Sequence, residues 1–129
     1  MKTAEQAVHD ELWKRLSGLV AGNVYDSRPM NDVGYPFADF EDSDVTFTGT
    51  KNGHLSRVNI NLNIWDKQEN RQAVSSVCNW LFLYASRLQE AYGYRVSLRI
   101  GDSSIKIIED RTVTPSVWRG IVTLVFDIL

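Results

Sequence analysis

The stretch that decides the fold is RVNINLNIW, residues 57–65, in which apolar and polar side chains alternate. Successive side chains of a strand point to opposite faces, so this alternation gives the segment one apolar face. It predicts a strand that is covered by a core on one side only, as in an antiparallel sheet. The apolar face comprises Val58, Ile60, Leu62 and Ile64, and the other face Arg57, Asn59, Asn61, Asn63 and Trp65.

The chain just before this strand is expected to run antiparallel to it. Asn52-Gly53, within residues 50–54, supplies the positive φ angles that a tight hairpin turn requires. Residues 37–41 and 44–48 are rich enough in apolar and β-branched side chains to form the partner, as two strands or as one interrupted strand. Residues 26–35, DSRPMNDVGY, have the composition of an irregular loop.

Helical spacing of apolar residues appears twice. Residues 3–21 predict an amphipathic helix, with Thr3 and Gln6 as a capping box. Residues 67–92 predict a longer helix that Gly93 ends.

Three further strands are predicted, at residues 94–100, 104–109 and 116–128. The order α-β-β-α-β-β-β then predicts a single α+β domain over residues 1–129. Its sheet is mixed or antiparallel, with the long helix packed on one face and a second helix at the N-terminus.

Composition limits the possible functions. Fourteen basic and sixteen acidic residues give a formal charge of −2 without a basic run, which argues against a nucleic-acid-binding surface. The single cysteine, Cys78, rules out an internal disulfide and suits a reducing compartment. No signal segment opens the chain, and no apolar run approaches the ~20 residues of a membrane span. We therefore expect a protein made in a cytoplasm, without a membrane partner.

The densest polar cluster is DFEDSD, residues 39–44, with carboxylates at Asp39, Glu41, Asp42 and Asp44. Oxygen ligands of this kind suit a hard cation. However, the spacing, central glycine and distant glutamate of a calcium loop are missing. A solvated acidic edge is the better interpretation, and such charges also discourage accidental pairing between strand edges.

Other chemistry-bearing residues form no recognisable constellation. His9 opens an HDE fragment of a metalloprotease helix, but Trp13 stands where the second histidine would be. His54 has no adjacent carboxylate or nucleophile, Cys78 lies in the apolar stripe of the second helix, and no glycine-rich phosphate loop is present. We therefore expect no enzyme, no cofactor and no metal. A small enzyme or ligand-binding domain with a dispersed site stays open as the alternative.

Apolar residues also occur outside the expected buried faces. Trp80 and Leu83 lie off the stripe of the second helix, and the last predicted strand is apolar on both sides. Either these residues belong to a wide buried arc, or they contact another subunit.

The order of elements resembles the tail-terminator proteins of long-tailed bacteriophages, also called tail-completion or head–tail joining proteins. The resemblance covers nearly the whole chain, and no single motif in it is specific. It rests on the N-terminal helix leading to Val24-Tyr25-Asp26, then Tyr35-Pro36-Phe37, Asn63-Ile64-Trp65-Asp66, the long helix and the final strand from Trp118 to Phe126.

The resemblance implies a virion protein that forms a six-membered ring on the end of the tail tube. Such a ring contacts the tail tube protein and the head connector, while genome DNA passes through its lumen without specific binding. Protein contacts are then expected at Trp80 and Leu83, at the hairpin residues Lys51, Asn52 and His54, and at the loop residues Arg28 and Met30. The acidic residues Asp39, Glu41, Asp42 and Asp44 are candidates for the lumen wall, where they would keep DNA from adhering.

Overall fold

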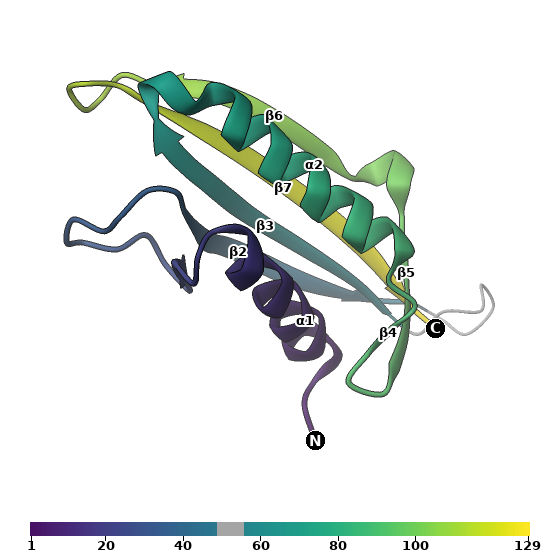
Figure 1. The fold of residues 1–129 in the computed structure, drawn as a ribbon. Coiled ribbons are helices and arrows are strands. Elements are labelled where there is room, and N and C mark those ends of the chain that lie inside the picture. Colours follow the sequence, from purple (N-terminus) through teal and green to yellow (C-terminus); the bar gives the residue numbers. More distant parts are fainter. Residues whose placement is uncertain (49–55) are drawn as a thin grey trace.

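The computed structural model describes residues 1–48 and 56–129 and confirms the α+β class with a mixed sheet (Figure 1). The predicted hairpin turn, with Lys51, Asn52 and His54, lies outside the described residues. The elements are α1 (Ala4–Leu19), β1 (Val24–Tyr25), β2 (Phe37–Phe47), β3 (Ser56–Lys67), η2 (Gln68–Asn70), α2 (Arg71–Arg87), β4 (Glu90–Ala91), β5 (Tyr94–Leu98), η3 (Ile100–Asp102), β6 (Ser104–Asp110) and β7 (Val117–Ile128).

The sheet is built around β3 and β7. Its strand order is β1-β2-β3-β7-β5-β4, and β6 also pairs with β7. One edge of β7 is paired with β3 along its whole length. The other edge is shared, because β6 takes residues 117–123 and β5 takes residues 126–128. Among the described strands, β1 and β2 are the parallel pair, and the others are antiparallel.

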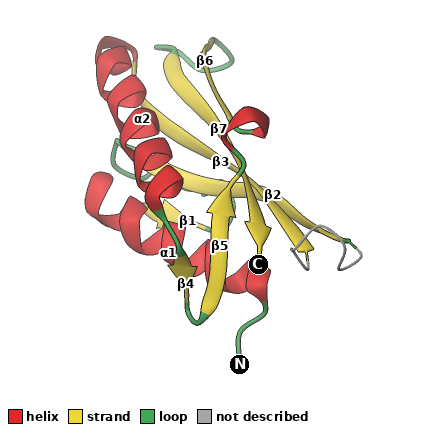
Figure 2. Ribbon diagram, turned by 90° about the vertical axis from the view of Figure 1, so that its right-hand side faces the viewer, coloured by secondary structure: helices red, strands yellow, loops and turns green. Residues whose placement is uncertain are grey.

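Both helices cover the same face of the sheet, with α1 over β2 and β3 and α2 over β3 and β7 (Figures 1 and 2). The predicted apolar face of residues 57–65 is buried beneath them, and Val58, Leu62 and Ile64 have no exposed surface. We call the opposite face, which carries Asn59, Asn61 and Asn63, the open face.

The N-terminal helix begins where it was predicted to begin. The Thr3 hydroxyl accepts a hydrogen bond from the Gln6 amide over 3.1 Å, which confirms the N-cap. The Gln6 side chain does not return to Thr3. It donates to the Asp10 carboxylate over 2.8 Å instead.

The second helix is shorter than predicted, because residues 67–92 also contain a 3-10 turn and a short strand. A 3-10 turn, η2, precedes the helix, and α2 ends at Arg87, since Leu88 is already extended at ψ 125°. β4 then turns back onto β5 through Tyr92 and Gly93, at φ 47° and 92°. Two successive residues with positive φ are the requirement of a two-residue hairpin turn, so Gly93 serves a hairpin and does not end a helix.

The acidic segment belongs to one continuous strand. β2 runs through residues 42 and 43, where an interruption was predicted, with a β-bulge between Phe40 and Asp42. The bulge places Glu41 opposite no residue of β3, so the alternation of faces shifts by one position.

Gly120 of β7 lies directly under α2. A Cβ atom at this position would collide with the Cys78 sulfur and lie 3.0 Å from Val74 Cγ1. The absent side chain therefore lets the helix backbone approach the sheet closely.

Candidate functional site

The open face carries rows of polar side chains that bond across three strands. Asn61 of β3 lies between Asp42 of β2 and Thr123 of β7. The Thr123 hydroxyl donates to Asn61 Oδ1 over 2.7 Å, and Asn61 Nδ2 donates to Asp42 Oδ1 over 2.7 Å. These side-chain hydrogen bonds link β2, β3 and β7 at the position of Asn61.

The structure divides the predicted acidic cluster into buried and exposed carboxylates. Asp39 is 3% exposed and accepts hydrogen bonds from Asn63 Nδ2 over 3.0 Å and Trp65 Nε1 over 3.2 Å. Glu41, Asp42 and Asp44 are exposed, and Glu41 pairs with Arg119 over 2.9 Å. Over residues 1–48 and 56–129, no group of three or more His, Cys, Asp or Glu side chains could hold a metal ion.

Trp65 anchors the loop that follows β1. It is 2% exposed, and the guanidinium groups of Arg28 and Arg119 lie 4.2 and 5.2 Å from its ring centroid. A guanidinium over an indole is held by the ring quadrupole and by dispersion. Arg28 therefore joins the loop to the open face, whereas Met30 in the same loop is fully exposed.

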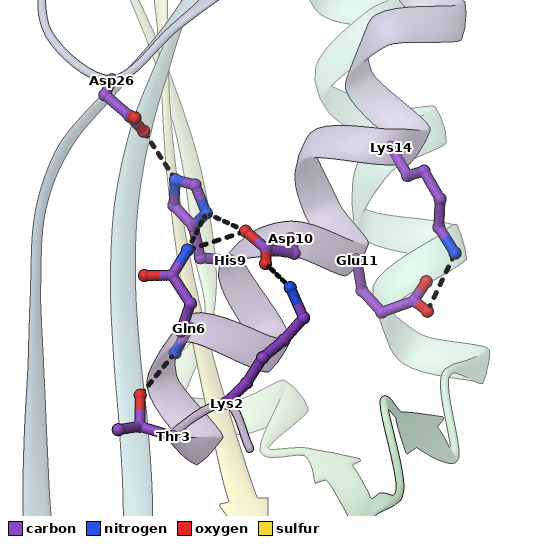
Figure 3. A network of polar contacts seen from close by, with 8 residues as sticks. All are labelled: Lys2, Thr3, Gln6, His9, Asp10, Glu11, Lys14 and Asp26. Atoms are coloured by element: carbon purple, nitrogen blue, oxygen red, sulfur yellow. Dashed lines mark hydrogen bonds and ion pairs between the residues drawn. The ribbon is translucent and has the colours of Figure 1, made fainter.

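On the helix side, His9 joins α1 to the start of that same loop (Figure 3). Its Nδ1 lies 2.8 Å from Asp10 Oδ1 and its Nε2 lies 2.7 Å from Asp26 Oδ1. Each ring nitrogen thus faces a carboxylate oxygen, and both can donate only when the imidazole is protonated. Burial lowers the pKa of His9, but the bonds to Asp10 and Asp26 outweigh it, so the pKa is raised.

Asp10 is the centre of this network. Its carboxylate also accepts from Lys2 Nζ over 2.5 Å and from Gln6 Nε2 over 2.8 Å (Figure 3). Burial raises the pKa of Asp10, yet the three donors prevail and lower it to about 2. The prediction from sequence found no constellation at His9 and so missed the network, because Asp26 comes 17 residues later.

Two hollows flank β2, and several of their charged groups are paired with other charged side chains. One, of about 270 Å³, is lined by Gln6, His9, Asp26, Phe40 and Glu41, among others. In it His9 is paired with Asp26, and Glu41 with Arg119. The second, also of about 270 Å³, lies beside Trp65 and contains the pair of Arg119 and Glu41.

The predicted contact residues of α2 are on its outer surface. Trp80 is 51% exposed and Leu83 is 39% exposed. Cys78 is buried in the core on the inner side of the same helix, and burial raises the pKa of its thiol to about 12. Among the described residues, no helix has the length and apolarity needed to cross a membrane.

Comparisons with known proteins reveal a shared fold. No family model matches the chain, and neither does any curated protein. A solved chain from the virion of a native gene transfer agent (GTA) particle is similar, with a TM-score of 0.65 and 13% sequence identity. The match covers 97% of this chain and 93% of that chain, so the likeness extends over nearly the whole of both.

Proposed function

We propose that this protein is a structural subunit of a phage-like virion. In this role it caps the tail tube as a ring and joins the tail to the head connector. Genome DNA passes through its lumen.

The single observation that carries this proposal is the fold shared with a chain of a GTA virion over 97% of this chain. The order of helices and strands agrees with the tail-terminator resemblance, from α1 through the paired strands and α2 to β7. The exposed apolar side chains Trp80 and Leu83 supply surface for contacts between subunits or with the tail tube protein.

In the proposed ring, which we expect to be hexameric, the open face lines the channel and the helices lie outside. The exposed carboxylates of Glu41, Asp42 and Asp44 then face the DNA. Repulsion between these carboxylates and phosphate reaches across roughly a Debye length of ~8 Å at physiological salt, which keeps the duplex off the wall. Asp39 contributes little to this field, because it is buried in its bonds to Asn63 and Trp65.

The proposal is tested by disrupting the gene in the genome that encodes it and imaging the particles. We expect heads and tail tubes that remain separate, with tubes of uncontrolled length, and joined particles when the intact gene is supplied in trans. Purified protein added to isolated tubes should appear as rings on the tube ends. Normal joined particles from the disrupted genome would refute the proposed role.

The lumen assignment needs a separate experiment. Asp42→Asn together with Asp44→Asn removes two exposed charges and keeps side chains of the same size. We expect particles that assemble normally but eject DNA more slowly, with a stronger dependence on salt. Asp39→Asn is the matched control, since the same change at a buried site should leave ejection unaltered in particles that assemble. Failed assembly of the double variant would instead place Asp42 and Asp44 in a protein contact.

A further inference from the structure

The outer edge of β6 has no strand partner within residues 1–48 and 56–129. The direction of its backbone groups follows from Val125 of β7. The Val125 amide donates to Ser103 Oγ over 3.2 Å, and the Val125 carbonyl accepts from the Arg99 amide over 2.7 Å. Val125 therefore directs its backbone groups away from β3, toward the side of β7 on which β6 lies.

Residues two positions apart in a strand direct their backbone groups to the same side. The odd-numbered residues of β7 from 117 to 123 therefore bond to β6, where they lie opposite the even-numbered residues from 104 to 110. Ile105, Ile107 and Glu109 then direct their amide and carbonyl groups outward from the edge. An edge with such free groups is a template for another strand unless its side chains prevent pairing.

The open face of this edge carries one positive and one negative side chain. Lys106 is exposed and lies opposite Ile121, and Asp110 lies opposite Val117, so both are on the open face. Ile108 lies between them on the same face. A lone lysine on an edge usually discourages pairing, but this order of charges is complementary to its own reverse.

Asp110 can accept a cation from outside its own chain. The Thr112 hydroxyl and amide donate to Asp110 Oδ1 over 2.6 and 2.9 Å, and within the described residues no donor reaches Oδ2. The hydrogen bonds from Thr112, with the positive charges of Arg28 and Arg119, lower the pKa of Asp110. Arg119 belongs to β7 and Arg28 lies over Trp65 of β3, so both are on the inner side of Asp110, away from the free edge.

We propose that two copies of the free protein pair through β6, antiparallel and in one continuous sheet, about a two-fold axis at Ile108. In this register Lys106 of each copy lies opposite Asp110 of the other, and Ile108 lies opposite its own counterpart. Ile107 lies opposite Glu109 of the other copy, and these outward-directed residues form the backbone hydrogen bonds.

Other registers lack this match of charges. An axis at Ile107 places Lys106 opposite Ile108, and an axis at Lys106 places two lysines opposite each other. Registers that pair an even-numbered with an odd-numbered residue cannot form the ladder, because one of the two directs its backbone groups inward.

The pairing also covers apolar side chains along this edge. Ile105 is 36% exposed on the helix face, while Ile100 before the strand and Val113 after it are 59% and 40% exposed. Antiparallel pairing places the segment after one β6 beside the segment before the other, which brings Val113 of one copy toward Ile100 of the other. Glu109 adds no net charge to the helix face, because Arg111 of its own chain lies 2.8 Å away.

This contact is separate from the one that would close the proposed ring. A two-fold contact joins like surfaces, whereas neighbours in a ring of equivalent subunits meet through unlike surfaces. The β6 contact therefore pairs subunits before they assemble, and it keeps the free edge covered in the meantime.

A disulfide at the axis tests the register. Ile108→Cys places two sulfurs across a non-hydrogen-bonded pair, whose Cα atoms are about 4.5 Å apart and within reach of a disulfide. We expect a covalent dimer on non-reducing gels after oxidation. Lys106→Cys is the matched control, because its counterpart lies roughly 13 Å away along the strands and should not cross-link. Cys78 does not compete, since it is buried. Absence of the Ile108→Cys dimer, or equal cross-linking of both variants, would overturn the inference.

Charge reversal tests the ion pairs without a cross-link. For the wild type we expect a dissociation constant of roughly 10–100 µM in analytical ultracentrifugation, because the contact is small. Lys106→Glu places carboxylates opposite each other twice and should weaken dimerisation by about 3- to 30-fold. Adding Asp110→Lys restores unlike pairs and should recover the dimer, with circular dichroism to check folding. Arg95→Glu, an equal reversal on exposed β5 surface, is the matched control and should dimerise normally.

Two results would refute the pairing. A dimer that Lys106→Glu leaves unchanged would show that its contact lies elsewhere. A wild-type protein that stays monomeric at millimolar concentration would leave the β6 edge to a strand of another protein, and so overturn the pairing of copies.

Discussion

Replacing Gly120 by alanine should expose how closely α2 approaches the sheet. The new Cβ would overlap the Cys78 sulfur and press on Val74 Cγ1 at 3.0 Å. All surrounding side chains are fully buried, so relief requires a shift of the helix or of core rotamers. Overpacking of this kind costs about 1–3 kcal/mol, which lowers the melting temperature by roughly 3–6 °C for each kcal/mol at this chain length.

The reasoning is checked by adding Cys78→Ala, which removes the sulfur that the new methyl group meets. Alone, this truncation should cost about 1 kcal/mol for the lost contacts of a buried sulfur. In the double variant the alanine at 120 can occupy the vacated space, so the combined loss should be smaller than the sum by at least about 0.5 kcal/mol. Urea unfolding of the wild type, the two single variants and the double variant gives the coupling free energy between positions 78 and 120. Strictly additive losses, or an alanine at 120 that does not destabilise, would refute the close approach.

Four further perturbations follow from the contacts described. His9→Gln should lower the free energy of unfolding below pH 6.5, where the histidine is charged in folded and unfolded chains alike. Because the pKa of His9 is raised in the folded protein, this loss should shrink as the pH rises through the folded pKa. A loss that does not depend on pH in urea titrations would count against the bridge to two carboxylates. Asp39→Ala leaves two buried donors without an acceptor and should cost about 2–4 kcal/mol, whereas Asp39→Asn keeps an oxygen and should cost less. Thr3→Ala should cost about 1 kcal/mol through the lost N-cap, with Thr3→Ser close to the wild type in thermal unfolding. The thiol of Cys78, with its pKa raised to about 12, should react with a thiol reagent only as fast as the protein unfolds, and rapid labelling of the native protein would contradict its burial.

The sequence predicted best those elements whose periodicity is set by burial on one face. Residues 57–65 alternate strictly, and they are the centre of β3 with their apolar side chains in the core. The predicted end of α2 was wrong, because Tyr92 continues the helical spacing of the apolar residues on this helix. Local spacing cannot show that residues 90–91 pair with β5 and that the backbone turns at Tyr92 and Gly93.

The site was less predictable, since its bonds join residues far apart in the chain. Asp39 was placed in a solvated acidic edge, but its donors Asn63 and Trp65 come 24 and 26 residues later and bury it. Local composition indicates that carboxylates cluster, and the register of β2 on β3 decides which of them is covered. For Trp80 and Leu83 the sequence left a wide buried arc open as an alternative, and their exposure on the outer surface of α2 excludes it.

The position of β7 affects when this fold can form during synthesis. β7 is the last of the described elements to leave the ribosome, and it holds β3, β5 and β6 together. Until it emerges, β6 has no strand of its own chain to lie against, and β3 and β5 lack the strand that joins them. Formation of the central sheet therefore waits for the synthesis of residues 117–128, even though α1, β2 and β3 are made much earlier.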